Sequence, residues 1–383
     1  MLSALQNHPL LLLAVSCLTA FFITLLSIPS IIAVAKAKHL YDEPNGRTSH
    51  TISTPTLGGM GIYAGLIISS MLFVSIASIG YIQFIIAASI IIFFIGLKDD
   101  ILSISPLKKL LGQIVAAAII IDLGHVRFTD LHGFLGFHEI GYLPSMLISL
   151  FVIIVTINAF NLIDGIDGLA SGIGMLVVGF FGVWFFLIGH TQLSVLSFAL
   201  FGSLAAFFRF NVFSKKNKIF MGDIGSLTLG FFIAVLMIRF NELNATINSP
   251  YAINGSPVIS FAILILPMFD TLRVFIIRIS KGQSPFKADK LHVHHRLLAL
   301  RKSHIQATTI LIITNAGFIL LALLLQNLNI YILGAIIISL ALILSYIPVY
   351  ICKRRNANTL GSTKEPTTKQ IKTSPLKSSF LDH

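Results

Sequence analysis

The 383-residue chain is 55% hydrophobic and only 11% charged, and its mean hydropathy is +0.90. A water-soluble domain could not bury that much apolar surface, so the composition excludes an ordinary soluble protein and indicates an integral membrane protein. With only two cysteines, Cys17 and Cys352, no disulfide framework is expected. The net charge of +12 needs no nucleic acid to explain it, because a membrane protein with many basic loops carries such a charge.

Apolar runs long enough to cross roughly 30 Å of hydrocarbon recur along the chain. Backbone exposed to lipid must satisfy its own hydrogen bonds, so these runs are expected to be helices and the fold all-α. The first run is preceded by no Lys or Arg and is too long for a signal-peptide core, so we expect a retained helix. We expect about eleven transmembrane helices, and counts of ten or twelve would also fit. They are placed at 10–35, 57–79, 80–97, 107–124, 144–163, 169–189, 192–211, 226–240, 256–279, 306–326 and 328–351.

The expected membrane domain covers residues 1–352, and 353–383 is expected to be a basic, disordered tail because it lacks apolar residues to bury. Of the basic residues, only Arg127 and Arg239 fall on the side opposite the tail. By the positive-inside rule the tail side is cytoplasmic and the N-terminus lies outside. Seven aspartates lie on the cytoplasmic side, at helix ends or in loops, which predicts one cytoplasmic cleft; they are Asp99, Asp100, Asp164, Asp167, Asp223, Asp270 and Asp289.

The stretch "GLKDDILSISPLKKLLGQ" places Asp99 and Asp100 next to each other where one span ends and another begins. Neighbouring carboxylates do not both ionise comfortably unless a cation lies beside them, which suits a divalent metal or a general base. The alternative is a solvated helix cap, since Asp is favoured at a helix N-terminus.

The stretch "NAFNLIDGIDGLASG" repeats Asp-Gly at a spacing of three residues and has no Lys or Arg nearby in the sequence. Gly165 and Gly168 allow tight turns and close approach of a ligand to the backbone. A plain polar turn between helices is the alternative. In "KIFMGDIGSLTLG", Asp223 lies between glycines just before a span, whose exposed amides could hold phosphate oxygens. A helix cap would explain Asp223 but would leave Phe220 unexplained.

The basic loop after Asp270 contains "HVHHR", a dense set of donors suited to a phosphate, a sugar or a lipid headgroup. Its members are His292, His294, His295 and Arg296. A metal-binding histidine tract and an ordinary positive-inside loop are the alternatives. The adjacent Arg argues against the metal, since it would repel a cation.

These motifs, with "DEPNGRTSHTISTPTLGGMGIY" before them, occur in an order that resembles the polyprenyl-phosphate N-acetylhexosamine-1-phosphate transferase family. The resemblance covers nearly the whole chain up to the tail. It implies an enzyme of the bacterial inner membrane that transfers sugar 1-phosphate from a UDP-N-acetylhexosamine to undecaprenyl phosphate and releases UMP. It also implies a requirement for Mg²⁺ or Mn²⁺, and a homodimer as a candidate assembly. "HVHHR" looks like the branch that uses UDP-N-acetylglucosamine for a cell-envelope glycan.

The resemblance also implies roles for individual residues. Asp223 would be a metal ligand with Asp164 close to the metal, and Asp99 and Asp100 would handle the lipid phosphate, one of them as a base. Lys109 matches a family Lys that follows the paired aspartates. The remaining matches concern the nucleotide and the donor: Asp167 and Phe220 for uracil, Asn161 for the ribose-phosphate region, Asn211 for the nucleoside, and the histidine motif for the donor substrate.

One position departs from the pattern: Thr54 stands where the pentapeptide branch of the family has a Lys, and Arg47 is the nearest substitute. The chemistry itself exchanges one phosphoanhydride for another, so no ATP is needed, and no Walker A pattern occurs. We therefore expect metal and nucleotide to be the partners of Asp164 and Asp167. Direct attack by the lipid phosphate is favoured over a phospho-enzyme, because a phosphate monoester with a second pKa of about 6 hardly needs a base.

A secondary transporter or channel is the main rival interpretation. Transporters typically carry ionisable residues at mid-membrane and often show repeated halves. The chain shows no convincing internal repeat, and its acids lie at one face. A non-catalytic scaffold would not need Asp-rich motifs in several loops.

Overall fold

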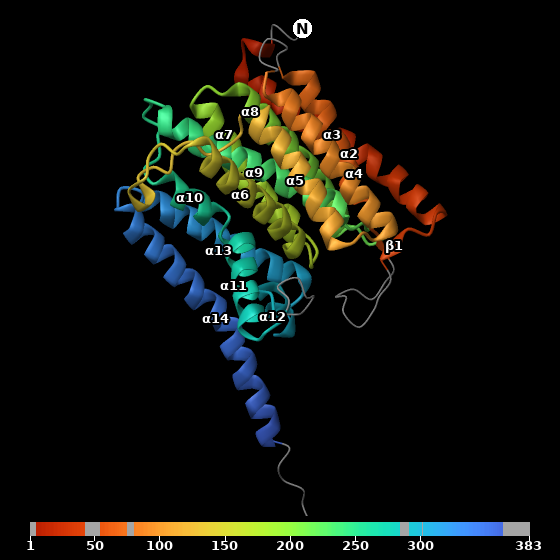
Figure 1. Ribbon diagram of the computed structural model, residues 1–383. Helices are drawn as coiled ribbons and strands as arrows, with labels where there is room; N and C mark the ends of the chain where they lie inside the picture. The colour runs from red at the N-terminus through yellow and green to blue at the C-terminus, as the bar shows by residue number, and fades with distance from the viewer. Residues whose placement is uncertain (1–4, 43–53, 75–79, 284–290, 301, 363–383) are drawn as a thin grey trace, which may run out of the picture.

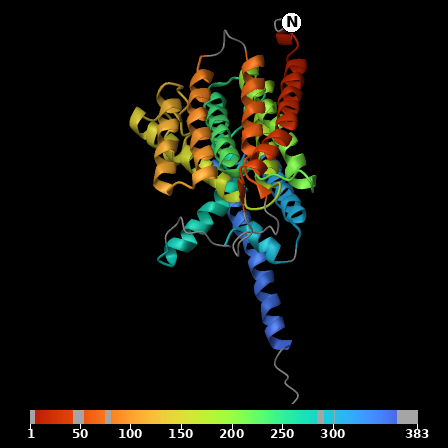
Figure 2. The same cartoon turned by 90° about the vertical axis from the view of Figure 1, so that its right-hand side faces the viewer.

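The computed structural model describes residues 5–42, 54–74, 80–283, 291–300 and 302–362. It confirms an all-α architecture: long helices lie side by side in one bundle (Figures 1 and 2). Within the described ranges, the only paired strands are β1 (Tyr41–Asp42) and β2 (Thr54–Pro55), which are antiparallel, with Tyr41 opposite Pro55.

Every apolar run expected to form a helix contains one. The helices are α2 (Pro9–Ala37), α3 (Gly58–Phe73), α4 (Ile82–Leu102), α5 (Pro106–Asp122), α6 (Tyr142–Ile163), α7 (Leu169–Leu187), α8 (Thr191–Phe208), α9 (Gly222–Thr246), α10 (Ser256–Ile263), α11 (Ile265–Ser280), α12 (Val293–Ala299), α13 (His304–Leu324) and α14 (Ile330–Ser362). A short 3₁₀ turn, η2 (Phe134–Gly136), lies between α5 and α6, and a π-helical turn, η3 (Arg209–Phe213), continues α8.

Seven of the described helices are long and apolar enough to cross a membrane, or eight if the bent pair α10 and α11 is one span. The chain is therefore a multi-pass membrane protein, but the expected count of about eleven transmembrane helices is not confirmed. The run at 57–79 yields only the 16 residues of α3, and 107–124 the 17 residues of α5. The run at 226–240 belongs to the longer, 25-residue helix α9.

The span expected over 256–279 is broken, because α10 and α11 meet at an angle of 82°. Pro267 explains the break: it lacks an N–H, and its ring would clash with the carbonyl of Ile263, at which α10 ends. Buried Asn315 of α13 donates a hydrogen bond of 2.9 Å to that carbonyl and accepts one of 3.4 Å from Leu266 N–H. The bend thus exposes backbone groups that a neighbouring helix satisfies.

The central helix of the bundle is α9, whose apolar side chains are almost all buried against α4, α6, α3 and α7. Glycines permit the closest approaches. A Cβ on Gly59 of α3 would lie 2.1 Å from the backbone nitrogen of Gly225 of α9, so the two helices touch backbone to backbone. This contact fixes where α9 begins, next to the β1–β2 hairpin.

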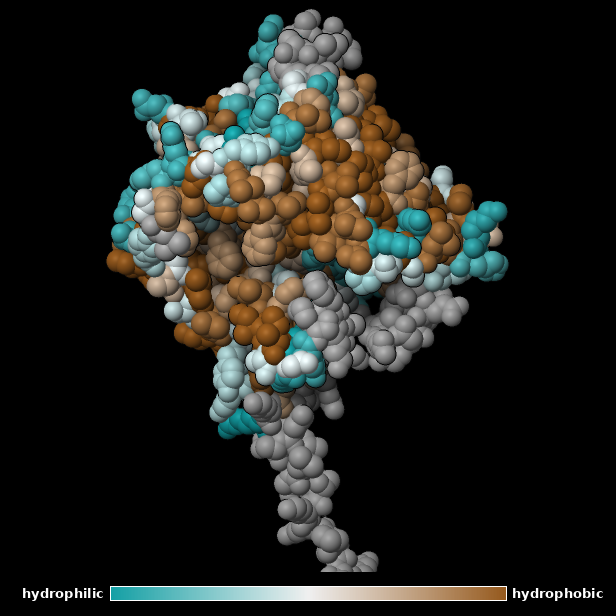
Figure 3. Space-filling model, viewed as in Figure 1, coloured by the Kyte–Doolittle hydropathy of each residue, from teal (hydrophilic) through white to brown (hydrophobic). Residues whose placement is uncertain are grey.

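The face of the bundle drawn in Figure 3 carries broad apolar areas. Large side chains such as Leu26, Phe151 and Leu324 are 72%, 66% and 71% exposed. Surfaces of this extent are unfavourable in water and are expected where a protein faces lipid. At one end, α11, α12 and the last turns of α14 project beyond the bundle (Figure 2). Helix α14 continues to Ser362, so the expected domain boundary at 352 falls inside it, and residues 363–383 lie outside the described part.

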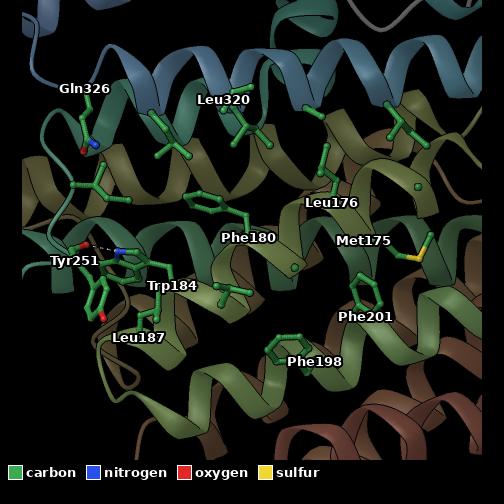
Figure 4. Close-up of a pocket in the computed structure, with 18 of the residues that line it drawn as sticks. Met175, Leu176, Phe180, Trp184, Leu187, Phe198, Phe201, Tyr251, Leu320 and Gln326 are labelled. Atoms are coloured by element: carbon green, nitrogen blue, oxygen red, sulfur yellow. Dashed lines mark hydrogen bonds between the residues drawn. The ribbon is translucent and has the colours of Figure 1, made fainter. Parts of the chain in front are cut away.

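An apolar groove of about 1060 Å³ runs between α7, α8 and α13 (Figure 4). Phe180, Phe198 and Leu320 line its middle, and at one end Trp184 donates a hydrogen bond of 3.0 Å to the carbonyl of Tyr251. Its other end, at Gly172 and Phe208, lies about one helical turn from the polar residues described next.

Candidate active site

A second pocket, of about 580 Å³, is lined mainly by polar groups. It lies where the ends of α4 and α6, the α6–α7 turn, η3 and the start of α9 meet, with α12 and α13 covering one side. The residues expected in the site that line it are Asp99, Asp100, Asn161, Asp164, Asp167, Asn211, Phe220, Asp223 and His295. Helices far apart in the sequence thus bring the Asp-rich motifs together.

The α6–α7 turn is held in a tight conformation by Gly168, whose φ of 76° lies in the left-handed region. A Cβ there would lie 2.6 Å from a methyl of Val212 and 2.8 Å from the ring of Phe208. Asn211 fixes the same turn, since its Oδ1 accepts a hydrogen bond of 2.6 Å from Gly168 N–H. Its Nδ2 donates to the carbonyl of Ile219 at 2.9 Å, which ties the turn to the loop before α9.

Asp167 has partners that its local sequence does not reveal. Its Oδ2 lies 2.7 Å from Lys218 Nζ and 3.0 Å from His304 Nδ1. The Thr308 hydroxyl donates a hydrogen bond of 2.7 Å to its backbone carbonyl. Burial alone would raise the pKa of Asp167, but the hydrogen bonds from His304 and Lys218 and the Lys218 charge outweigh it and hold the pKa below its ordinary value. Asp167 is therefore an anion at neutral pH, and the expectation that it lacks a Lys partner is wrong.

The carboxylate of Asp164, three residues earlier, has different surroundings. Burial raises its pKa well above the ordinary value, and the charges of Asp223, Asp100 and Asp167 raise it further. Within the described ranges, no hydrogen bond or ion pair reaches its carboxylate. A carboxylate surrounded by other carboxylates needs a proton or an added cation.

Asp100 lies against the start of α9. Its carboxylate accepts backbone hydrogen bonds from Asp223 at 2.8 Å and from Ile224 at 3.1 Å. Gly222, with φ of 69°, permits this approach, because a Cβ there would lie 2.6 Å from Asp100 Oδ2 and 2.2 Å from the carbonyl of Thr56. Asp100 therefore caps α9 from another helix, satisfying N–H groups at its N-terminus.

Lys109, at the start of α5, joins the acids of two other helices. Its Nζ lies 3.0 Å from Asp99 Oδ2, 2.7 Å from Asp223 Oδ2 and 3.4 Å from Asn161 Oδ1. Asn161 also donates from Nδ2 to Asp223 Oδ1 and, at 2.9 Å, to the Ser226 hydroxyl. The result is a cation enclosed by oxygens from α4, α6 and α9.

The residues of the histidine motif lie in two different surroundings, one in the pocket and the others away from it. His295 lines the pocket, whereas His292 and His294 are only 4% and 2% exposed and, with Arg296, are not among its lining residues. Burial lowers the pKa of His294 to about 3, so this ring is neutral at physiological pH and does not act as a cation toward phosphate. It packs under the α6–α7 turn, where a Cβ on Gly165 would lie 2.6 Å from its Nε2.

His292 is held by Asp270 of α11, whose Oδ2 lies 2.9 Å from its Nδ1. Arg273 donates to Asp270 Oδ1 at 2.7 Å and to the carbonyl of Leu291 at 2.8 Å. The His292 and His294 rings stack nearly parallel, 5.7 Å apart, and His294 and His295 are 4.3 Å apart. The buried acid thereby fixes the segment that carries His295 to the pocket.

The groups of this site that could bind a divalent ion are carboxylate oxygens. The described residues contain no group of three or more His, Cys, Asp or Glu side chains arranged around a common metal position. Mg²⁺, however, is usually held by one or two carboxylates, with water and substrate phosphates completing its coordination. Asp99 and Asp223, which already share one cation, match that requirement.

The motifs of the sequence do not mark every residue of the pocket. His304, Tyr41, Thr56 and Ser103 also line it. His304 follows Ser303, whose reciprocal hydrogen bonds with Gln306 form a capping box at the start of α13. That capping signal was visible in the sequence, but the contact with Asp167, 137 residues away, was not.

An apolar helical bundle with an Asp-rich polar pocket at one end defines a membrane protein with a candidate active site at that end. The model of glycosyl transferase family 4 matches residues 82–241, the segment that supplies most of the pocket. The matched segment is similar to this family, and it covers less than half of the chain.

Curated relatives agree with the family. The chain is 29% identical over 317 residues to the undecaprenyl-phosphate alpha-N-acetylglucosaminyl 1-phosphate transferase of Escherichia coli, covering 81% of this chain and 83% of that one. It is also 29% identical over 320 residues to the decaprenyl-phosphate N-acetylglucosaminephosphotransferase of Mycobacterium leprae, covering 77% and 79%. The similarity therefore extends beyond the segment matched by the family model.

Proposed function

We propose that the protein transfers N-acetylglucosamine 1-phosphate from UDP-N-acetylglucosamine to a polyprenyl phosphate, giving the polyprenyl-diphospho-sugar and UMP. The observation that carries the proposal is that Asp99 and Asp223, which line a pocket at one end of a membrane bundle, both contact Lys109 of a third helix. Mixed anionic and cationic groups at such a point suit the joining of two phosphorylated substrates, one soluble and one in the bilayer. Relatives over four-fifths of the chain carry names with this activity.

The nucleotide is assigned to the part of the pocket formed by Asp167, Asn211 and Phe220. Asp167 is anionic and keeps Oδ1 available to accept a hydrogen bond from a base, while Lys218 and His304 hold Oδ2. The Phe220 ring offers a face for stacking, and Lys218 Nζ lies 5.5 Å from its centroid. His295 is assigned to the sugar or the donor phosphates.

A divalent ion, Mg²⁺ or Mn²⁺, is assigned to Asp223 and Asp99 with Asp164 close by. When bound, it would neutralise phosphate charge and polarise the attacked phosphorus. The chain's own residues supply the rest: Asn161 orients Asp223, and Asp100 holds the backbone from which Asp223 extends. Lys109 supplies a positive charge beside the phosphates.

Direct attack by the lipid phosphate agrees with this geometry. Both Asp100 oxygens accept backbone hydrogen bonds, and Asp99 is engaged by Ile104 N–H and Lys109. A phosphate monoester is mostly dianionic near pH 7, with a second pKa of about 6, so neither acid is required as a base. We assign the pocket to the cytoplasmic face of a bacterial inner membrane, because the basic loops lie at the same end.

The test is UMP release by the purified protein given undecaprenyl phosphate, Mg²⁺ and UDP-N-acetylglucosamine, with an Asp223→Asn variant beside it. Release that requires the lipid, the ion and Asp223 supports the proposal. Release only with another UDP-N-acetyl sugar would keep the chemistry and change the donor. No release with any donor from folded protein would overturn the transferase in favour of a transporter.

A further inference from the structure

The side chain of Lys109 places a positive charge between two acids of the site. The Lys109 ammonium lies within 3.0 Å of carboxylate oxygens from Asp99 and Asp223, and its side chain is only 14% exposed. Its neighbour in the sequence, Lys108, is exposed. Two adjacent lysines thus lie in contrasting surroundings, one enclosed by acids and the other at the surface.

The acids around Lys109 are oriented by other groups. Asp99 Oδ1 accepts a hydrogen bond of 2.8 Å from Ile104 N–H, and Asp223 Oδ1 accepts one from Asn161. Each carboxylate therefore has one oxygen fixed by a donor, and both remaining oxygens lie against the same Nζ atom. Oxygens that converge in this way on a positive charge are the ligands that a hard divalent ion prefers.

We propose that Lys109 is an internal placeholder: its ammonium occupies the cation position between Asp99 and Asp223 when no divalent ion is bound, and a divalent ion must displace it. The two cations compete for the same oxygens and repel each other, so they do not share the position. The inference rests on the proposed function only in assigning a divalent ion to these two acids.

Displacement would give Lys109 a second use. Its flexible four-carbon stem extends from the start of α5, beside Asp99 at the end of α4, so a released ammonium remains at the edge of the pocket. There it becomes available to a substrate phosphate only after the ion has arrived. Binding should therefore be ordered, with the ion first and the phosphate second. In the metal-free protein, the Lys109 ammonium also reduces the repulsion between the two carboxylates.

The experiment measures Mn²⁺ binding to the full chain in lipid nanodiscs, by the electron paramagnetic resonance signal of free Mn²⁺, without nucleotide or lipid acceptor. Lys109→Met removes the charge and keeps most of the stem. Lys109→Gln, a second neutral variant, keeps a hydrogen-bond donor in case the first does not fold. Lys108→Met is the matched control, because it removes the same charge from the adjacent exposed position. Asp223→Asn reports whether the bound Mn²⁺ is at this site.

Both neutral Lys109 variants are expected to bind Mn²⁺ at least about tenfold more tightly than the wild type, whereas Lys108→Met changes the affinity little. Without Mn²⁺, the Lys109 variants should also unfold at a lower temperature than the wild type, and Mn²⁺ should raise that temperature by more. Unchanged or weaker Mn²⁺ binding in the Lys109 variants would overturn the placeholder and leave the transferase standing. Absence of any Asp223-dependent Mn²⁺ binding in the wild type would instead remove the metal site from the proposed function.

Discussion

Asp100 accepts a hydrogen bond of 2.8 Å from the backbone N–H of Asp223, so one acid of the site holds the backbone of another. The same carboxylate also accepts from Ile224, which places it across the N-terminus of the most buried helix of the bundle. The adjacent pair Asp99 and Asp100 therefore separates into two roles. Asp99 contacts the cation of the site, and Asp100 contacts the helix that presents Asp223.

The first prediction concerns Asp100→Asn. The amide keeps the size of the side chain but loses its charge and turns an N–H₂ group toward N–H donors, which should lower the free energy of unfolding by about 1–3 kcal/mol. Displacement of Asp223 should reduce UMP release roughly 100-fold. Because Asp100 acts through Asp223, Mn²⁺ affinity should fall together with activity. Loss of activity at unchanged Mn²⁺ affinity would instead point to Asp100 as a direct base, and Asp122→Asn, at the other end of the bundle, serves as the control.

A second prediction concerns pH and Lys218. The folded-state pKa of Asp167 lies below its ordinary value, so its ion pairs stabilise the fold above pH about 4 and lose that effect as the pH falls. Lys218→Met removes one partner and leaves the burial, which raises the pKa of Asp167. Stability at neutral pH should therefore fall, and the loss of stability on acidification should become smaller, whereas UMP binding should weaken at a higher pH than in the wild type. Melting temperatures between about pH 3 and 8, with and without UMP, provide the measurement.

Lys216→Met is the control for this change, since Lys216 is an exposed residue of the same loop. This variant should leave the pH dependence of stability and the pH dependence of UMP binding as they are in the wild type. If the two variants behave alike, the effect comes from the general charge of the loop and not from the contact with Asp167.

A third prediction concerns the α6–α7 turn. Gly168→Ala places a Cβ at a φ of 76°, which costs about 1–2 kcal/mol, and forces it against Phe208 and Val212. The Gly168 N–H bond to Asn211 should be lost, and with it the position of Asp167. Binding of UMP, followed by calorimetry, should weaken by at least about tenfold. Gly189→Ala is a useful comparison, because Gly189 has a similar φ of 81° with open space around it; equal effects of the two changes would exclude a specific role for the α6–α7 turn.

The sequence allowed the helices to be predicted because each is a long apolar run, and the membrane leaves such runs little alternative. It also indicated most of the acids that gather in one pocket, since the Asp-rich motifs follow or precede spans on one side. Asp270, which was expected among them, does not line the pocket, and Asp289 lies outside the described residues. The break between α10 and α11 was missed, although Pro267 was a visible cause. A continuous apolar run hides a bend that depends on Asn315, a residue of another helix.

The partners of the acids could not be predicted in the same way. Lys109 and Asp223 are 114 positions apart, and Asp167 and His304 are 137 apart. Hydropathy shows that a span exists but not which helices are neighbours, so these pairs became visible only in the fold. For the same reason the histidines appeared to be one group of donors, although His294 supports the α6–α7 turn and His295 lines the pocket.

The last prediction concerns Asp270, which does not line the polar pocket but is almost fully buried between Arg273 and His292. Asp270→Asn leaves Arg273 without its carboxylate partner. It also weakens the hydrogen bonds of Asp270 with His292 and with Val293 N–H, which fix the start of α12. Removing one partner of a buried pair should cost about 3–5 kcal/mol of stability. Because His295 follows on α12, kcat/KM for the UDP-sugar should fall roughly 100-fold. Binding of UMP, which lacks the sugar, should change little, since Asp167 and Phe220 lie on other elements. A variant that loses stability but keeps kcat/KM would show that Asp270 serves the fold alone, and equal losses for UMP and the UDP-sugar would show that the whole pocket had been disturbed.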